Sequence, residues 1–158
     1  MVGTVPAAPR GKGENHMPVP AALERIVDDF AAAPPDLRIE LLLEYSDALP
    51  PLPERFAGHD EMEQVTECQA PFFLASEVAD DRVRVWFDCP PEAPTTRSFA
   101  GILAEGLDGA PAGDVLAVPE DFYLRMGLGE VISPLRLRGM TAILARLKRQ
   151  VREAAAAA

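Results

Sequence analysis

Two short apolar runs on either side of the sequence ADDR, residues 79–82, limit the fold more than any other feature. Asp80 and Asp81 favour a tight turn, so the runs are predicted to form two neighbouring antiparallel strands. In the second run, RVRVWFD, valine and phenylalanine alternate with polar residues, and Trp86 falls on the wetter face. Such alternation is typical of a sheet that packs one face on a core. We therefore expect a hairpin covered on one side by helices.

Helical periodicity precedes this hairpin. From Ala21 onward, apolar residues recur at the spacing of one helix face, and Pro34 and Pro35 end that helix. Asp36 is then the predicted N-cap of a second helix. The predicted apolar face of this second helix consists of Leu37, Leu41, Tyr45 and Leu49.

Further helices are predicted after the hairpin. A third helix is predicted to have Ser98 or a preceding threonine near its N-cap and to close at Gly106 and Gly109. Its apolar residues are Phe99, Ile102, Leu103 and Leu107. The sequence DVLAV that follows fits either a short edge strand or a turn of helix, and PEDFYLRMG fits a short helix opened by Pro119.

The last helical segment carries the clearest signals. Ser133 is the predicted N-cap and Pro134 the first helical residue. An apolar stripe follows, made of Met140, Ile143, Leu144, Leu147 and Val151. The order helix, helix, hairpin, helices predicts an α+β domain, in which a small antiparallel sheet of about three strands packs against helices.

The length of 158 residues suits one domain. Residues 1–18 combine glycine, proline and charge without periodicity, which is typical of a disordered extension. We expect a single domain over residues 19–153 and an alanine tail over residues 154–158.

Composition excludes several classes of function. The formal net charge of -10 argues against a nucleic-acid partner, which would require a basic face. No stretch approaches the roughly 20 apolar residues of a membrane-spanning helix, so no membrane association is expected. The N-terminal residues lack the apolar centre of an export signal, and we expect a cytoplasmic protein with two reduced cysteines. Two cysteines and two histidines do not make an ordinary zinc site, and the common nucleotide-binding motifs do not occur.

Cys68, in the sequence VTECQAP, is the main candidate for chemistry. It is expected in the loop that enters the first hairpin strand, where functional residues are common. The preceding Glu61, Glu63 and Glu67 disfavour the thiolate, so the local sequence does not activate this thiol. From position alone, a small buried apolar side chain is the simpler interpretation. His59, the one histidine within the predicted domain, fits an exposed turn better than a catalytic base.

Cys89 is expected to remain a separate free thiol. A turn at Asp80 and Asp81 places Cys89 opposite Phe72, four residues along the strand from Cys68. At about 3.3 Å per residue this offset is roughly 13 Å, beyond the limit of about 7 Å for a disulfide. Cys89 is therefore predicted to be a packing residue at the strand end.

Gly139 stands inside the last helix, where glycine costs about 1 kcal/mol relative to alanine. Such a glycine indicates close approach of another backbone. The alternative is a helix packed tightly on the sheet, with the neighbouring Arg136 and Arg138 simply solvated.

Together these segments resemble the SufE-like sulfur acceptors, which accompany cysteine desulfurases in iron-sulfur cluster assembly. The helix pair ending in ALPPLPE is similar to the family's helix followed by Leu-Pro. VTECQAPFFL resembles the family segment V-x-G-C-Q-S-x-V-W, and ISPLRLRGMTAIL resembles L-[ST]-P-S-R-x-x-G-x-x-A-[MI]. The likeness runs from about Leu23 to Val151.

The resemblance implies a SufE-like α+β fold and a role for each matching residue. Cys68 would accept the sulfur of a desulfurase persulfide, Gln69 follows it as in the family, and Arg136 and Gly139 would belong to the partner-binding surface. The implied partner is a SufS-like cysteine desulfurase, which this chain would stimulate, with a cluster scaffold as a downstream recipient. The pyridoxal phosphate would belong to the partner, and no cofactor is expected on this chain, nor any turnover without the partner.

The chain departs from the family pattern at the reactive loop, where Glu67 replaces glycine and Ala70 replaces serine. Leu135 replaces the serine after Pro134. Two alternatives to the acceptor role stay open: a binding module that docks on a desulfurase without carrying sulfur, and a thiol-dependent enzyme that works alone with His59 as its base.

Overall fold

The computed structural model describes residues 19–157, and the predicted disordered segment at residues 1–18 lies outside them. The α-helices are α1 (Ala21–Ala32), α2 (Pro35–Asp47), α3 (Pro94–Leu107), α4 (Ala112–Leu116) and α5 (Pro134–Ala157). The strands are β1 (Glu63–Gln64), β2 (Phe73–Ala79) and β3 (Arg82–Asp88). The 3-10 helices of this part of the chain are η2 (Glu54–Phe56), η3 (Phe122–Met126) and η4 (Leu128–Glu130).

The three strands form one antiparallel sheet in the order β1-β2-β3. Strands β2 and β3 pair along their whole length of seven residues each, whereas β1 adds two residues to the edge of β2. Asp80 and Asp81 form the turn with φ values of 53° and 63°. Tight hairpin turns need this left-handed conformation, which aspartate adopts more readily than most residues do. The predicted hairpin and its turn are confirmed.

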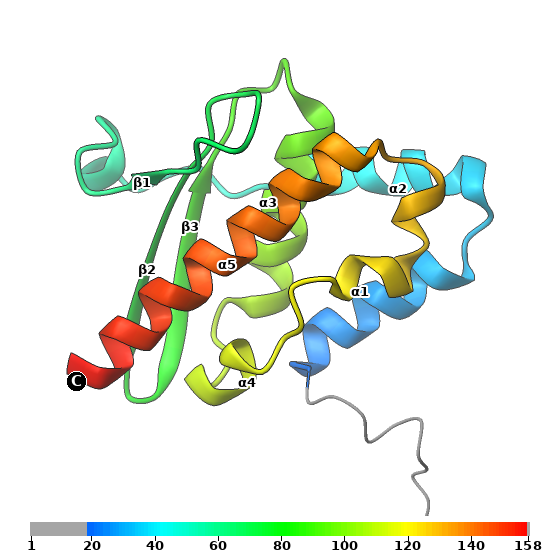
Figure 1. Ribbon diagram of the computed structural model, residues 1–158. Helices are drawn as coiled ribbons and strands as arrows, with labels where there is room; N and C mark the ends of the chain where they lie inside the picture. Colours follow the sequence, from blue (N-terminus) through cyan, green and yellow to red (C-terminus); the bar gives the residue numbers. More distant parts are fainter. Residues whose placement is uncertain (1–18, 158) are drawn as a thin grey trace, which may run out of the picture.

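Helix α3 lies at the centre of the molecule (Figure 1). Helices α3 and α5 pack on the apolar face of the sheet, and α1 and α2 pack on α3 from the other side. The second face of the sheet is covered in part by the η2 segment, where the rings of Phe56 and Trp86 lie 5.1 Å apart between centroids. This arrangement is the α+β layer structure that the sequence predicts.

Helix α2 begins two residues earlier than predicted and buries a different face. Asp36 is not its N-cap, because Pro34 takes that position and Pro35 is the first helical residue. The buried residues are Arg38, Leu42 and Ser46, whereas Leu37 is 46% exposed. The arginine is buried because its guanidinium donates to the Phe30 carbonyl at 3.0 Å and pairs with Glu130 at 2.8 Å.

Helix α3 differs from the prediction at its start and at Gly106, whereas Gly109, with a φ of 85°, lies two residues after the helix end and closes it as predicted. It begins at Pro94 with Ala93 as N-cap, so neither Ser98 nor a threonine caps it. Ser98 is fully buried within the helix and donates to the Thr95 carbonyl. Gly106 lies inside the helix rather than ending it, where an added Cβ would stand 2.8 Å from Leu23. The chain leaves the helix after Leu107.

DVLAV, the segment of undecided type, contributes to α4. PEDFYLRMG, predicted as a short helix opened by Pro119, contains the 3-10 helix η3, which begins at Phe122 with Asp121 as its N-cap, so Pro119 does not open it.

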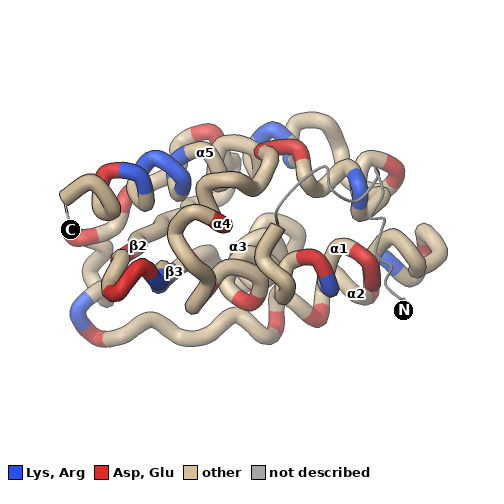
Figure 2. The backbone as a smooth tube through the Cα atoms, turned by 90° about the horizontal axis from the view of Figure 1, so that it is seen from below, with Lys and Arg blue, Asp and Glu red and all other residues tan. Residues whose placement is uncertain are grey.

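Helix α5 agrees with the prediction at its start and along its stripe. The Ser133 hydroxyl accepts a hydrogen bond from the Arg136 backbone N–H at 3.3 Å, and all five predicted stripe residues are buried. The helix continues through Ala157, so most of the alanine segment forms its last turns. Lysine and arginine residues gather along α5, as the blue segments of Figure 2 show, while α1 and α2 are mainly acidic. Within residues 19–157, no helix has the length and apolar character needed to cross a membrane.

Candidate functional site

Cys68 lies in a loop whose two ends are held together by a backbone hydrogen bond; we call these joined ends its neck. We call residues 66–71, between β1 and β2, the Cys68 loop. Val65 and Phe72 flank it, and both are almost fully buried. The Val65 backbone N–H donates to the Phe72 carbonyl at 2.8 Å, and the Cys68 N–H donates to the Val65 carbonyl at 3.2 Å. The core therefore holds both ends of the loop, while its tip carries the thiol.

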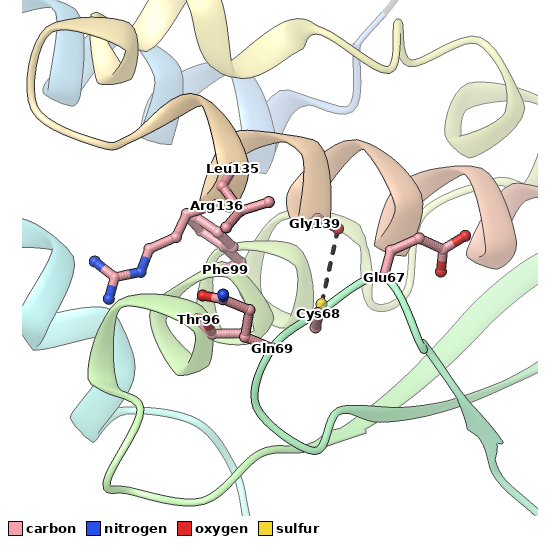
Figure 3. A pocket seen from close by; sticks show the side chains of 8 residues that line it. All are labelled: Glu67, Cys68, Gln69, Thr96, Phe99, Leu135, Arg136 and Gly139. Carbon is pink, nitrogen blue, oxygen red and sulfur yellow. Dashed lines mark hydrogen bonds between the residues drawn. The ribbon is translucent and has the colours of Figure 1, made fainter.

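Gly139 of α5 provides the space that the Cys68 side chain occupies. The Cys68 sulfur lies 4.0 Å from the Gly139 carbonyl oxygen (dashed line in Figure 3). A Cβ at Gly139 would lie 3.3 Å from this sulfur, which is tighter than ordinary packing, and 3.9 Å from the Cys68 Cα, an ordinary contact. Gly139 thus has a close neighbour, but the nearest atom is the sulfur of the candidate reactive residue rather than another backbone, as was predicted.

The space around the thiol is nearly filled. The cavity beside Cys68 measures about 10 Å³. This volume holds about one water molecule and leaves no room for a metabolite. Figure 3 shows the lining, which consists of Glu67, Cys68, Gln69, Thr96, Phe99, Leu135, Arg136 and Gly139. The four residues that the sequence singled out, Cys68, Gln69, Arg136 and Gly139, thus lie at one place in the fold.

The environment of Cys68 keeps the thiol protonated. Burial and, to a smaller extent, the charge of Glu67 raise its pKa to about 11, while Arg146 opposes this rise. Of the three glutamates expected to disfavour the thiolate, Glu67 is the one that raises this pKa, and burial is the larger cause. In this conformation Cys68 is a weak nucleophile at neutral pH.

Gln69 and Arg136 border the open side of the site. Both also line a shallow depression of about 230 Å³ that reaches the first turn of α3 at Thr95 and Thr96. In Figure 3, Arg136 extends away from the thiol, and Glu67 points to the side opposite Gln69. Beside the small cavity there is thus an exposed surface with an arginine and an amide, on which a macromolecular partner could rest.

A comparison with known families decides the relationship. Residues 24–151 match the family model described as "SufE: Fe-S metabolism associated domain".

The chain belongs to the SufE family.

Several relatives share this similarity. SufE-like proteins of two Mycobacterium tuberculosis strains, both described as uncharacterized, are 56% identical over 137 residues, which cover 86% of this chain and 95% of theirs. A hypothetical protein of Thermus thermophilus, known from its solution structure, has a TM-score of 0.79 and 46% identity, covering 87% of this chain and 98% of that one. The chloroplastic and mitochondrial SufE-like protein 1 of Arabidopsis thaliana is 27% identical over 127 residues, which cover 80% of this chain and 33% of that protein. The fold is thus the SufE-like α+β fold.

Sequence reasoning did not single out Arg146, which holds the segment leading to Cys68. Its guanidinium pairs with Glu63 at 2.7 Å and with Glu67 at 2.8 Å. A signal was available, because Arg146 follows Gly139 by seven residues, about two helical turns, and so lies on the same face of α5. The apolar stripe dominates the pattern of this stretch and hides the signal.

His59 is engaged elsewhere in this SufE-family fold. Its Nε2 lies 2.6 Å from the Asp88 carboxylate, and its ring stacks on Phe73 with 3.9 Å between centroids. No hydrogen bond among residues 19–157 joins His59 to Cys68, so this conformation offers no base to the thiol.

Cys89 is a core residue at the end of β3. It is 1% exposed, and both cysteines are free. Burial, with a smaller contribution from Cys68, raises its pKa to about 12. These facts fit the predicted packing role. Across residues 19–157, no three histidine, cysteine or acidic side chains gather in a way that could hold a metal ion.

Proposed function

We propose that this SufE-family chain is a sulfur acceptor and carrier. Cys68 takes a persulfide sulfur from a cysteine desulfurase in the cytoplasm and passes it toward iron-sulfur cluster assembly, and removal of this sulfur stimulates the desulfurase. The observation that carries the proposal is the placement of Cys68 at the tip of a necked loop, beside a cavity of about 10 Å³. A thiol in such a place suits a macromolecular donor better than a free small substrate.

The transfer is a thiol exchange. The Cys68 thiolate attacks the outer sulfur of the donor persulfide, and a new S–S bond forms on Cys68. The S–S bond of the donor breaks, and the donor cysteine leaves as a thiolate, which takes up the proton that Cys68 gave up. No external oxidant or reductant is needed, because one persulfide replaces another.

Docking supplies the activation that the resting site lacks. In the resting conformation, burial and Glu67 hold the pKa of Cys68 near 11. We propose that binding moves the Cys68 loop away from Gly139 into the cleft of the partner, where positive groups favour the thiolate. Gln69 and Arg136 are proposed to contact the partner, because they lie on the exposed side of the site. The pyridoxal phosphate of the reaction belongs to the desulfurase.

Intact-mass measurement tests the acceptor role. The chain is incubated with a SufS-like desulfurase and free cysteine, and we expect a gain of one sulfur atom that peptide mapping assigns to Cys68. Cys68→Ser should abolish the gain, whereas Cys89→Ser serves as the matched control and should retain it. Absence of sulfur on Cys68 would contradict the acceptor role. If Cys68→Ser also kept full stimulation of the desulfurase, the chain would be a binding module.

A further inference from the structure

We infer that Arg146 is a positioning residue that latches the Cys68 loop onto α5 by binding the two carboxylates that precede Cys68. The inference deepens the proposed function and rests on it, since it concerns how the acceptor thiol is held until it is needed. We call the contacts of Arg146 with Glu63 and Glu67 the Arg146 latch.

One end of the latch is anchored firmly on the sheet. Glu63 belongs to β1 and accepts hydrogen bonds from Arg149 and Gln150 as well as from Arg146. Burial would raise the pKa of Glu63, but these hydrogen bonds outweigh it and hold the pKa below its ordinary value. Glu63 therefore stays ionised and in place at neutral pH, which fixes the guanidinium of Arg146 beside the loop.

The other end of the latch reaches the residue next to the thiol. The Nη2 and Nε atoms of Arg146 lie 2.8 Å and 3.1 Å from the same Glu67 oxygen. Weaker contacts reach the Gln64 carbonyl and the Thr66 hydroxyl, both at 3.4 Å. One guanidinium thus contacts four residues of the segment that leads from β1 to Cys68, and charge-assisted pairs of this kind are the stronger hydrogen bonds.

The freedom of Cys68 depends on the Glu67 end of the latch. Glu67 has a side chain 49% exposed, and Arg146 is the one ion-pair partner it has within residues 19–157. Opening the loop breaks this one ion pair at the surface. Glu63 would keep its hydrogen bonds with Arg149 and Gln150. The loop can therefore open at its tip while its neck at Val65 stays closed.

The two effects of Arg146 on Cys68 have opposite signs, which makes the inference testable. Its positive charge lowers the pKa of Cys68, so removing the charge alone would slow reaction of the thiol. Removing the latch exposes the thiol and speeds its reaction. The direction of the change in Arg146→Gln therefore separates the two roles.

The test is alkylation of Cys68 by iodoacetamide at pH 8, assigned by peptide mass spectrometry. For Arg146→Gln we expect a rate roughly three- to fivefold higher, the factor that corresponds to a loop contact worth up to about 1 kcal/mol. Arg149→Gln is the matched control, because it removes a partner of Glu63 without touching Glu67. Arg138→Gln removes an exposed charge of the same helix. Both controls should alkylate at the rate of the unchanged chain.

Two further measurements separate local opening from general destabilisation. Arg146→Lys should restore part of the slow rate, since lysine can pair with a carboxylate but lacks the fork that reaches two at once. The urea midpoint should be the same for Arg146→Gln and Arg149→Gln. An unchanged or slower alkylation rate in folded Arg146→Gln would overturn the inference.

If Arg146→Gln does not fold, the test is instead made on Glu67→Gln by measuring hydrogen exchange of the Cys68 backbone amide. The Cys68 amide, protected at rest by the Val65 carbonyl, should exchange faster than in Glu61→Gln, in which another acidic residue of the same approach to the loop is neutralised. Equal exchange in these two variants would also overturn the inference. Neither measurement uses a desulfurase, so the latch and the acceptor role can fail independently.

Discussion

At the scale of single residues, the contact between Cys68 and Gly139 combines two requirements at one position of α5. The helix has to continue, and its backbone has to leave space for a sulfur atom, so glycine is tolerated despite its cost in helix stability. The sequence predicted that another backbone approaches Gly139 closely, whereas the nearest neighbour is the Cys68 side chain. The identity of the neighbour depends on how the Cys68 loop folds back, and no local pattern encodes this.

Gly139→Ala is predicted to expose the thiol. The new methyl group would lie 3.3 Å from the Cys68 sulfur, and the loop tip can move more easily than α5. Alanine favours the helix by about 1 kcal/mol, which offsets much of the crowding, so the free energy of unfolding should change by less than about 1 kcal/mol. Iodoacetamide should modify Cys68 faster in this variant. Gly113→Ala, which meets nothing within 4 Å in α4, should leave alkylation unchanged, and the same result for Gly139→Ala would contradict the prediction.

The pH dependence of alkylation follows from the raised pKa of Cys68. Burial and Glu67 place this pKa at about 11. The alkylation rate of the native chain should therefore rise about tenfold per pH unit from pH 7 to pH 10 without levelling, whereas an ordinary thiol levels above about pH 9. Glu67→Gln should raise the rate at pH 8, and Glu61→Gln should not. A plateau near pH 9 in the unchanged chain would show that the thiol is exposed at rest.

At the scale of elements, α2 shows where periodicity misleads. The apolar residues Leu37, Leu41 and Tyr45 suggest one face, but the helix is rotated so that Arg38 and Leu42 are buried. An arginine in an apolar position hides the stripe from sequence reasoning, because its partners, the Phe30 carbonyl and Glu130, are distant in sequence. The hairpin and α5 were predictable because their signals, a turn, a cap and an alternation or stripe, are all local.

Gly101 is predicted to control the packing of α3 on α2. A Cβ at this position would stand 2.1 Å from the Tyr45 carbonyl oxygen, so one of the two backbones must move. Gly101→Ala should lower the free energy of unfolding by about 3 kcal/mol or more. In Gly106→Ala the new methyl group would lie 2.8 Å from the Leu23 Cδ1 and 3.1 and 3.2 Å from its Cβ and Cα, a milder clash that should lower the free energy of unfolding less. Urea unfolding measures both, and the reverse order would contradict this account of the α2 and α3 interface.

At the scale of the whole molecule, the charge is unevenly placed. The formal net charge of the chain is -10, yet six lysine and arginine residues lie on α5 alone. The order of the predicted elements correctly indicated an α+β fold, but the net charge averages over this difference between faces. The positions of Arg136 beside the thiol and of Arg146 on the loop become apparent only when the helix is placed on the sheet.

Stability of the molecule is predicted to fall at alkaline pH. Burial, as the main cause, raises the pKa of Cys68 to about 11 and the pKa values of Cys89 and Tyr45 to about 12. Above the ordinary pKa values of these groups, the native state binds more protons than the unfolded state, so the free energy of unfolding decreases as pH rises. Urea unfolding from pH 8 to pH 10.5 should show this decrease of the free energy of unfolding. The range begins below the ordinary cysteine pKa of about 8.5. Cys89→Ala should make the slope shallower, and an equal slope would contradict the assignment.

The closed neck of the Cys68 loop has a consequence for the oxidation of Cys68. Peroxide attacks cysteines that are ionised and accessible, and it converts them first to sulfenic acid and then to forms that cannot be reversed by thiols. The Cys68 sulfur is protonated and only partly exposed beside Gly139, so it fails the first condition and meets the second only in part. The resting conformation therefore preserves the residue from oxidative damage, and the only other cysteine of the chain, which is buried, does not have to serve as a resolving partner.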